Sequence, residues 1–298
     1  MRTRFKPDRG LTRRMVATGF LLGLLYVVFV AVLIALTRSA LLAIVIAGGL
    51  LFSQYWFSDR IALYAMRGQV VTPDQAPQLH GVIDRLCALA DMPKPAVAIA
   101  DSDMPNAFAT GRSPSKAVVC VTTGLLRRLD ADELDGVLAH ELSHIAHRDV
   151  AVMTIASFLG VLAGLITRFS LFGGVGRNRD QNTAVVVMVV VLVSAVVYVL
   201  SFLLTRALSR YRELAADRSS AILTGRPSAL ASALTKVSGE ISRIPTRDLR
   251  QAEAFNAFFF APALARGFSL SSLFSTHPPL EHRLDRLAVI ARELGQSG

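Results

Sequence analysis

Two histidines and a glutamate form the strongest chemical pattern in this sequence, His140-Glu141-Leu142-Ser143-His144. Residues four apart in a helix lie on the same face, so both imidazoles can bind one Zn²⁺ while Glu141 acts as a base towards water at the metal. Asp130-Ala131-Asp132-Glu133 is a capping box, which predicts that the helix begins there and ends at about His147. The alternative is a solvated histidine pair with no metal.

A catalytic zinc site needs a third protein ligand and an open position for water. His147 lies about one turn too far along the helix, and Val150 excludes the longer motif that has a third histidine there. Glu213 is the candidate, because it would lie about 13 Å beyond an apolar run while His144 lies about 9 Å before another, if the two runs form a membrane hairpin. Asp217, one turn later, could accept a hydrogen bond from a ligand histidine. The alternative is an acidic helix face paired with neighbouring arginines.

Four apolar runs must position these residues, at 15–36, 40–57, 150–166 and 183–204. As helices, the first and last are about 33 Å long, enough to cross a hydrocarbon core of about 30 Å, and the other two are about 25–27 Å long. We therefore predict four transmembrane helices. A buried core helix or a re-entrant segment is the alternative for the shorter two. The first run is too long for a cleaved signal peptide and no cleavage site follows it.

Positive charge predicts the orientation of these helices. Six Lys and Arg residues precede the first run, at positions 2, 4, 6, 9, 13 and 14, whereas only Arg38 lies between the first two runs. The N-terminus should therefore be cytoplasmic, and an even number of spans returns the chain to that side. We expect a multi-pass protein of the cell inner (plasma) membrane, with both termini and the active site in the cytoplasm. The arginine-bearing loop 167–182 would then lie on the opposite side.

The composition agrees with a membrane protein. The 298 residues carry a net charge of +10, are 52% hydrophobic and have a mean hydropathy of +0.47. Two cysteines are too few for a thiol-rich metal site or a disulfide framework, so Cys87 and Cys120 are expected to be packed thiols. The basic residues lie beside the apolar runs without interleaved aromatics, so nucleic acid is not an expected partner.

The chain should therefore have four parts. They are a basic segment with two transmembrane helices (1–57), the first half of a soluble domain with the histidine motif (58–149), a transmembrane hairpin (150–204) and the second half with the third ligand (205–298). In the soluble halves, patterns predict helices at 72–90, 130–147, 205–223, 227–238 and 280–294 and strands at 97–100, 106–110 and 117–122. Residues 255–274 have no clear pattern.

Four motifs together resemble the HtpX family of membrane zinc metalloproteases, which are relatives of the type I CAAX prenyl proteases. They are His140-Glu141-x-x-His144 followed by Arg148-Asp149, Glu213-x-x-x-Asp217 after a hairpin, Pro-Asn-Ala-Phe-Ala-Thr-Gly at 105–111, and Ser-Thr-His-Pro-Pro at 275–279 with Arg283 beyond it. The resemblance covers essentially the whole chain. It implies a mainly α integral membrane protein with four transmembrane helices and a cytoplasmic gluzincin-like α+β metalloprotease domain with a small sheet.

The resemblance also implies roles for individual residues. His140, His144 and Glu213 would hold one Zn²⁺ per chain, Glu141 would move the proton, and Asp217 would orient a ligand.

Further residues are implied to act on the substrate. His277 would donate to the oxyanion, with Arg283 as a second donor or orienter. The alternative for His277 is a turn residue before two prolines. An exposed edge strand would pair with the substrate backbone through Asn106, Ala107, Phe108 and Ala109, and its alternative is an ordinary strand of the small sheet.

We therefore expect a zinc-dependent membrane endopeptidase that acts on misfolded or damaged membrane proteins in protein quality control. Its expected partners are unfolded or membrane-protein substrates and the lipid bilayer. One alternative is a CAAX-type protease that cuts prenylated C-termini, and another is a non-catalytic membrane scaffold with a vestigial site.

Overall fold

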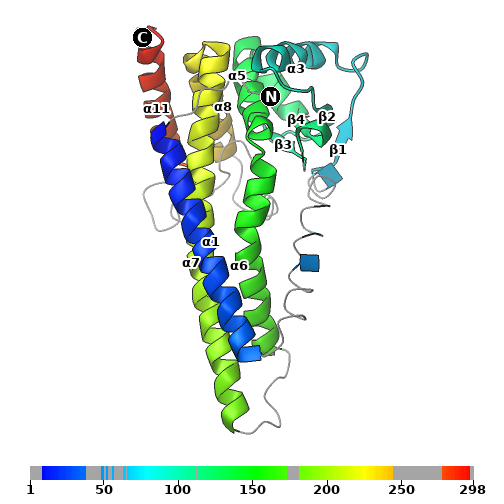
Figure 1. Ribbon diagram of the computed structural model, residues 1–298. Helices are drawn as coiled ribbons and strands as arrows, with labels where there is room; N and C mark the ends of the chain where they lie inside the picture. Colours follow the sequence, from blue (N-terminus) through cyan, green and yellow to red (C-terminus); the bar gives the residue numbers. More distant parts are fainter. Residues whose placement is uncertain are drawn as a thin grey trace.

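Three long helices run side by side and carry a smaller mixed domain at one end (Figure 1). They are α1 (Arg9–Thr37), α6 (Asp149–Phe172) and α7 (Gln181–Thr224). The computed structural model describes residues 9–37, 48–49, 52, 56, 63–64, 66–111, 113–172, 181–243 and 277–295.

The long helices pack through a narrow apolar seam. Phe29 of α1, Leu159 of α6 and Val197 of α7 are at most 5% exposed and belong to one cluster. On the outside of the same helices, large apolar side chains stay exposed, including Phe20 at 69% and Leu192 at 65%. Such a surface is unfavourable in water but suits contact with lipid.

Within the residues that the structure describes, two helices are long and apolar enough to cross a membrane, at Arg9–Ala31 and Met188–Thr224. The helix pair Ala131–Ala146 and Asp149–Gly164 passes the same test together, but it is bent by 64°. The predicted run 15–36 therefore overlaps the first candidate span, and 183–204 overlaps the second. The run 150–166 lies within α6. The run 40–57 lies outside the described residues except for a few positions, so the total of four spans stays a prediction.

The mixed domain contains a four-stranded sheet in the order β1-β2-β4-β3. Its strands are β1 (Gly68–Val70), β2 (Ala96–Ala100), β3 (Ala107–Thr110) and β4 (Val118–Thr122). β2 and β4 pair in parallel, while β1 and β3 are antiparallel to their neighbours and form the two edges. The three predicted strands are confirmed to within one residue at each end, and β1 was not predicted.

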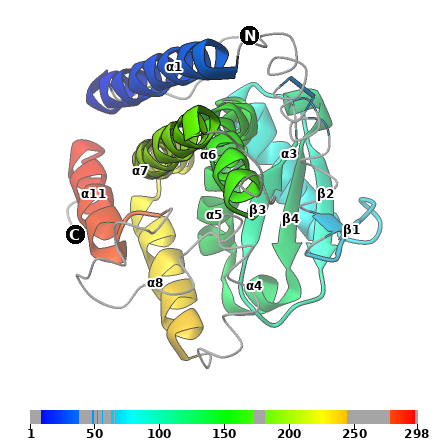
Figure 2. The same ribbon diagram turned by 90° about the horizontal axis from the view of Figure 1, so that it is seen from below.

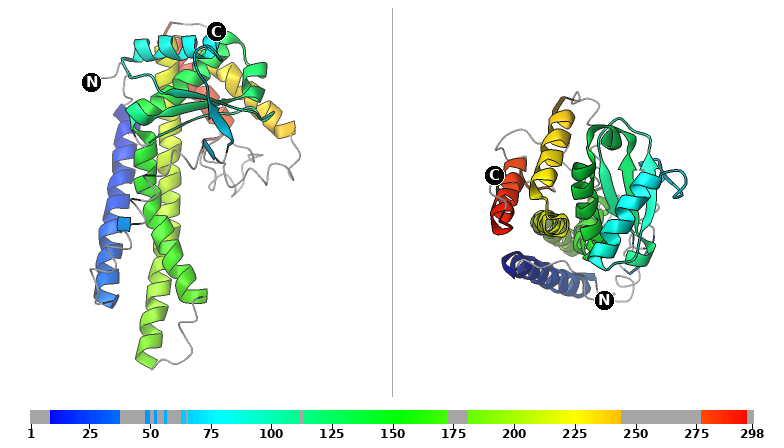
Figure 3. Two further views of the ribbon diagram at one scale, coloured as in Figure 1. Left: turned by 90° about the vertical axis from the view of Figure 1, so that its right-hand side faces the viewer. Right: turned by 90° about the horizontal axis from the view of Figure 1, so that it is seen from above.

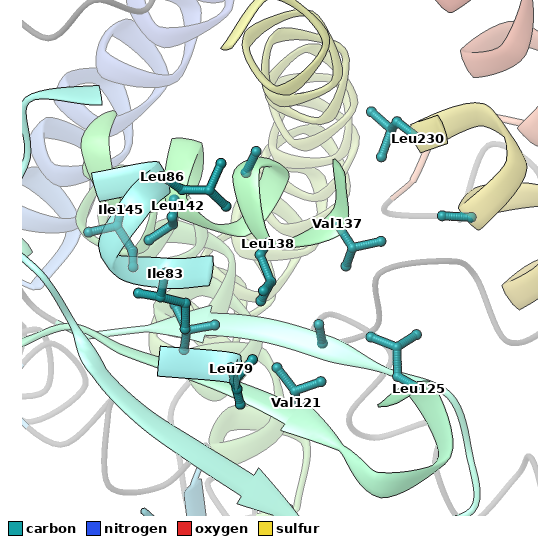
Figure 4. Close-up of a cluster of buried hydrophobic side chains, with 14 of the residues drawn as sticks. Leu79, Ile83, Leu86, Val121, Leu125, Val137, Leu138, Leu142, Ile145 and Leu230 are labelled. Carbon is teal, nitrogen blue, oxygen red and sulfur yellow. The ribbon is translucent and has the colours of Figure 1, made fainter. Parts of the chain in front are cut away.

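One face of the sheet is covered by helices α3 (Pro77–Ala90) and α5 (Ala131–Ala146), as Figures 2 and 3 show. Leu79, Ile83 and Leu86 of α3 meet Leu138 of α5 and Val121 of β4 in the main hydrophobic core (Figure 4). The short helices η1 (Pro114–Lys116) and α4 (Thr123–Arg128) flank β4, and α8 (Pro227–Arg243) and α11 (Leu280–Glu293) pack beside α5 and α7. The core therefore fixes α5 from several directions.

The first helix of this domain begins later than predicted. The sequence pattern placed its start at Thr72, but α3 begins at Pro77, because a proline there would clash with the preceding turn of a longer helix. Thr72 N–H does donate to Gln75 Oε1 at 2.8 Å, yet residues 72–76 form a turn in which Gln75 N–H and Ala76 N–H donate to Thr72 O.

A sharp bend joins α5 to α6. Arg148 has a φ of 56°, in the left-handed region, and α6 begins at the next residue, Asp149. The bend turns the chain from the mixed domain into the bundle of long helices, and it lies only a few residues beyond the second histidine of the motif.

Candidate metal centre

Helix α5 places both histidines of the motif on one side. The capping box is present as predicted: Asp130 accepts from Glu133 N–H at 2.9 Å, and the Glu133 side chain accepts from Asp130 N–H at 3.0 Å. The rings of His140 and His144 lie 4.8 Å apart with an angle of 85° between their planes. Their Nε2 atoms are 3.1 Å apart, so both nitrogens face one point.

Helix α7 brings Glu213 to the same point. It is a continuous helix of 44 residues, so the apolar run and the predicted helix at 205–223 are one element. Glu213 Oε1 lies 3.4 Å from His144 Nε2, and Oε2 lies 3.6 Å from His140 Nε2. One possible ligand atom from each of the three side chains lies within 4.8 Å of the others.

The outer nitrogens of both histidines contact carboxylates. His140 Nδ1 lies 3.0 Å from Asp217 Oδ1, and His144 Nδ1 lies 2.5 Å from Asp149 Oδ2. These contacts fix the ring orientations and leave each Nε2 to face the centre. Two imidazole nitrogens and a carboxylate, each histidine backed by a carboxylate, are the donor set that a catalytic zinc requires, so these residues fit the ion.

Asp217 and Glu213 are both held as carboxylates. Burial alone would raise the pKa of Asp217, but the charge and hydrogen bonds of Arg283 outweigh it, and the pKa is lowered. Burial likewise opposes ionisation of Glu213, but the charge of His277 and hydrogen bonds from three histidines bring its pKa well below the ordinary value. Both groups are therefore anionic at neutral pH, as binding of a cation requires.

Glu141 differs from Asp217 and Glu213, because its pKa is raised and not lowered. Its side chain is buried, and burial is the largest influence on its pKa, which is raised although the neighbouring histidines act against this. The backbone N–H of Ala109 in β3 donates a hydrogen bond to its carboxylate. A carboxyl group with a raised pKa beside two metal ligands is suited to accepting and returning a proton.

The C-terminal segment supplies His277 and Arg283, which are 5% and 1% exposed. His277 Nδ1 lies 3.0 Å from Glu213 Oε2. Arg283 donates to both oxygens of Asp217, from Nε at 2.8 Å and from Nη2 at 2.6 Å, and its Nη1 lies 3.8 Å from Glu213. The arginine therefore contacts Asp217, the carboxylate behind His140, and lies near the candidate ligand Glu213, which agrees with an orienting role.

Strand β3 is an edge strand, but its side chains are not exposed. Asn106, Ala107 and Phe108 are 0%, 1% and 3% exposed. Asn106 O accepts from Thr122 N–H at 2.9 Å, so by the alternation of an antiparallel pair Asn106 and Phe108 bond to β4, while the backbone groups of Ala107 and Ala109 face the free edge.

The sequence analysis did not assign a role to Asp149, although it noted Arg148-Asp149 as part of a motif. Its place five residues after His144 gives no helical face in common with the histidine. The contact exists because the chain bends by 64° between α5 and α6.

Known proteins are similar to this chain over most of its length. Residues 73–291 match the model of peptidase family M48. The chain is 65% identical over 298 residues to "Protease HtpX homolog 1" of Streptomyces coelicolor, covering 100% of this chain and 98% of the relative. It is 54% identical over 298 residues to "Protease HtpX homolog" of Moorella thermoacetica, covering 99% of each, and 42% identical over 285 residues to the protein of that name in Pyrococcus furiosus, covering 93% of each.

The fold also matches that of a solved structure. The crystal structure of S. mikatae Ste24p matches with a TM-score of 0.53 at 17% sequence identity, over 94% of this chain and 66% of the longer Ste24p chain.

Proposed function

Because this chain belongs to peptidase family M48, we propose that it is a zinc-dependent membrane endopeptidase that cleaves misfolded or damaged membrane proteins. One observation carries the proposal: His140, His144 and Glu213 converge from two helices, and Glu141 lies buried beside them. Its relatives are HtpX-type proteases, and its exposed apolar helices suit a membrane metalloprotease.

The residues that would hold the ion are His140 and His144 through Nε2 and Glu213 through its carboxylate. A zinc ion bound there would polarise the scissile carbonyl and make water acidic enough to attack near neutral pH. The protein's own contribution is a fixed set of ligands whose outer contacts, Asp217 and Asp149, are already in place.

Glu141 would carry the proton in this reaction. Its buried carboxylate takes a proton from the attacking water and returns it to the nitrogen of the leaving amine. The raised pKa of Glu141 supports both halves of that task, because a strongly acidic carboxyl group would hold the proton too weakly.

His277 is our candidate for the donor that stabilises the oxyanion, since it contacts the ligand Glu213 at the same centre. Arg283 would act through Asp217 and, through it, on His140. We assign it a positioning role.

The substrate would enter along the free edge of β3. Backbone pairing is largely indifferent to side chains, which suits the selection of unfolded segments. Of the four predicted residues, Ala107 and Ala109 have backbone groups directed to that edge, while Asn106 and Phe108 support the strand from the inner side.

The position of the centre supports membrane proteins as substrates. In α7, Glu213 follows the end of the apolar run at Leu204 by about 13 Å. A site so close to the surface can reach segments that leave the bilayer. The excess of basic residues before the first apolar run favours the inner membrane and a cytoplasmic site.

The substitution Glu141→Gln tests the mechanism, because it removes the proton acceptor without removing a ligand. Purified in detergent, the variant should bind one equivalent of zinc, as wild type does, and lose cleavage of an unfolded membrane protein by at least ~100-fold. Equal cleavage by both proteins would contradict the role of Glu141. A wild-type protein without zinc would contradict the function itself, and faster cleavage of a prenylated peptide would point to the CAAX-type alternative.

A further inference from the structure

The contact between Asp149 and His144 ties the metal centre to the membrane hairpin. Asp149 is the first residue of α6, and its Oδ2 lies 2.5 Å from His144 Nδ1. Its second oxygen, Oδ1, forms an ion pair with Arg212 of α7. One carboxylate therefore joins a predicted metal ligand, the first turn of one long helix and the side of another.

All members of this connection are shielded from water. The side chains of Asp149 and Arg212 are 11% and 3% exposed, and His144 is 16% exposed. Charge-assisted contacts gain strength in such surroundings, and an uncompensated charge there is costly. The three side chains are therefore expected to hold one arrangement.

The contacts of Asp149 also change the electrostatic potential at the metal position. The guanidinium of Arg212 contacts one oxygen of Asp149, and the other oxygen contacts His144, so it lies close to the place where a cation would bind. An unpaired arginine there would repel the cation, whereas an arginine paired with Asp149 is neutralised. Asp149 thus holds the ring of His144 and compensates the positive charge of Arg212.

We propose that Asp149 is a positioning residue through which the α6–α7 hairpin sets the affinity of the metal centre. This inference rests on the proposed function, because it assigns His144 and Glu213 to the same ion. The proposal also accounts for the bend between α5 and α6, because the bend brings the start of the hairpin back against the second histidine of the motif.

Asp149 also lies in the first turn of α6, where a carboxylate stabilises a helix through its dipole. A loss of stability on substitution would therefore not by itself support the proposal. The decisive measurements are the zinc dissociation constant, obtained by competition with a chromogenic chelator, and the visible spectrum of the Co²⁺-loaded protein. Thermal unfolding with chelator present measures the stability without metal.

The substitution Asp149→Asn should weaken zinc binding about 10- to 100-fold, the usual effect of removing a carboxylate that supports a ligand histidine, and should change the Co²⁺ spectrum. Asp135→Asn is the matched control. Asp135 lies on α5, is 13% exposed and pairs with Arg85 at 2.5 Å, but it precedes the motif and touches no ligand. It should leave both the affinity and the spectrum as in wild type.

The substitution Arg212→Gln tests the connection to the hairpin. It keeps Asp149 against His144 but removes the link to α7. Removing the positive charge would by itself favour the cation, so weaker zinc binding, by less than in Asp149→Asn, reports the lost link. Zinc affinity within twofold of wild type in the Asp149→Asn protein would overturn the proposal, and the same result in the Arg212→Gln protein would overturn its hairpin part. In either case, a wild type that still binds zinc and cleaves its substrate leaves the proposed function standing.

Discussion

At the scale of single residues, the centre depends on a series of buried charged groups in contact, each of which compensates the charge of the next. Arg283 holds Asp217, Asp217 holds the outer nitrogen of His140, and His140 faces the metal position. Arg283 and Asp217 are both 1% exposed, so neither charge can be compensated by water. Each carboxylate and cation is therefore tolerated only because its partner is present.

This balance predicts the result of Arg283→Met. The substitution leaves the Asp217 carboxylate buried without its cation, which should reduce the free energy of unfolding by about 3–5 kcal/mol. Chemical denaturation in detergent, with chelator present, measures this change without a contribution from the metal. Arg292→Met is the control, since Arg292 is exposed on the same helix. Equal stability of the two variants would show that the pair with Asp217 contributes little.

At the scale of elements, α5 is fixed at its start by more than its own capping box. Glu133 also accepts from Ser232 Oγ at 2.6 Å and from Lys236 Nζ at 2.7 Å, both on α8. Burial would raise the pKa of Glu133, but the hydrogen bonds from Lys236, Ser232 and the Asp130 N–H prevail and lower it. The helix that carries both histidines is thus tied to α8 by a carboxylate.

Because the pKa of Glu133 is lowered, the contribution of its contacts with α8 to stability depends on pH. A carboxyl group whose pKa is lower in the folded than in the unfolded state stabilises the fold above its unfolded pKa, and this contribution is lost as the pH falls through the folded value. Glu133→Gln should therefore cost about 1–3 kcal/mol at pH 7, with the share of Lys236 reduced by solvent. The difference from wild type should shrink as the pH falls below the ordinary Glu value of 4.5.

Unfolding measured from pH 7 down to pH 3 checks this expectation. Asp74→Asn, which changes an exposed acid in the turn before α3, should differ little from wild type across the range. A cost of Glu133→Gln that stays constant at all pH values would contradict an electrostatic origin.

At the scale of the whole molecule, the mixed domain and the long helices are built around one continuous helix. α7 begins in the apolar bundle, carries Glu213 and Asp217, and ends against α8. The side of the membrane on which α7 ends is therefore the side on which the enzyme acts.

Cysteine labelling can determine that side. Cys87 and Cys120 are buried, and burial raises their pKa to about 11 and about 12, so native thiols should react slowly with maleimides. A single exposed cysteine introduced as Ser115→Cys should be labelled by an impermeant maleimide in inside-out membrane vesicles and not in right-side-out vesicles. Wild-type protein gives the background, and the reverse pattern would place the site outside the cytoplasm.

The sequence was informative wherever structure follows from local periodicity. The capping box predicted the start of α5, and the spacing of His140 and His144 predicted their common face. Short apolar runs between polar, Gly- and Pro-containing turns predicted β2 and β4. The pattern at Thr72 predicts too early a start for α3, because Pro77 cannot continue a helix that has already begun. β1 has three residues, too few for an alternating pattern.

The sequence by itself determined the motif helix and the apolar runs, because hydropathy and helical spacing are properties of neighbouring residues. Glu213 was predicted from its distance to an apolar run, on the assumption that two runs form a hairpin. Only the tertiary structure decided that Asp149 contacts His144, that Arg283 contacts Asp217, and that the backbone of Ala109 contacts Glu141. Each of these contacts joins different elements. Their geometry depends on the bend between α5 and α6 and on the packing of α7 and α11, which no local pattern encodes.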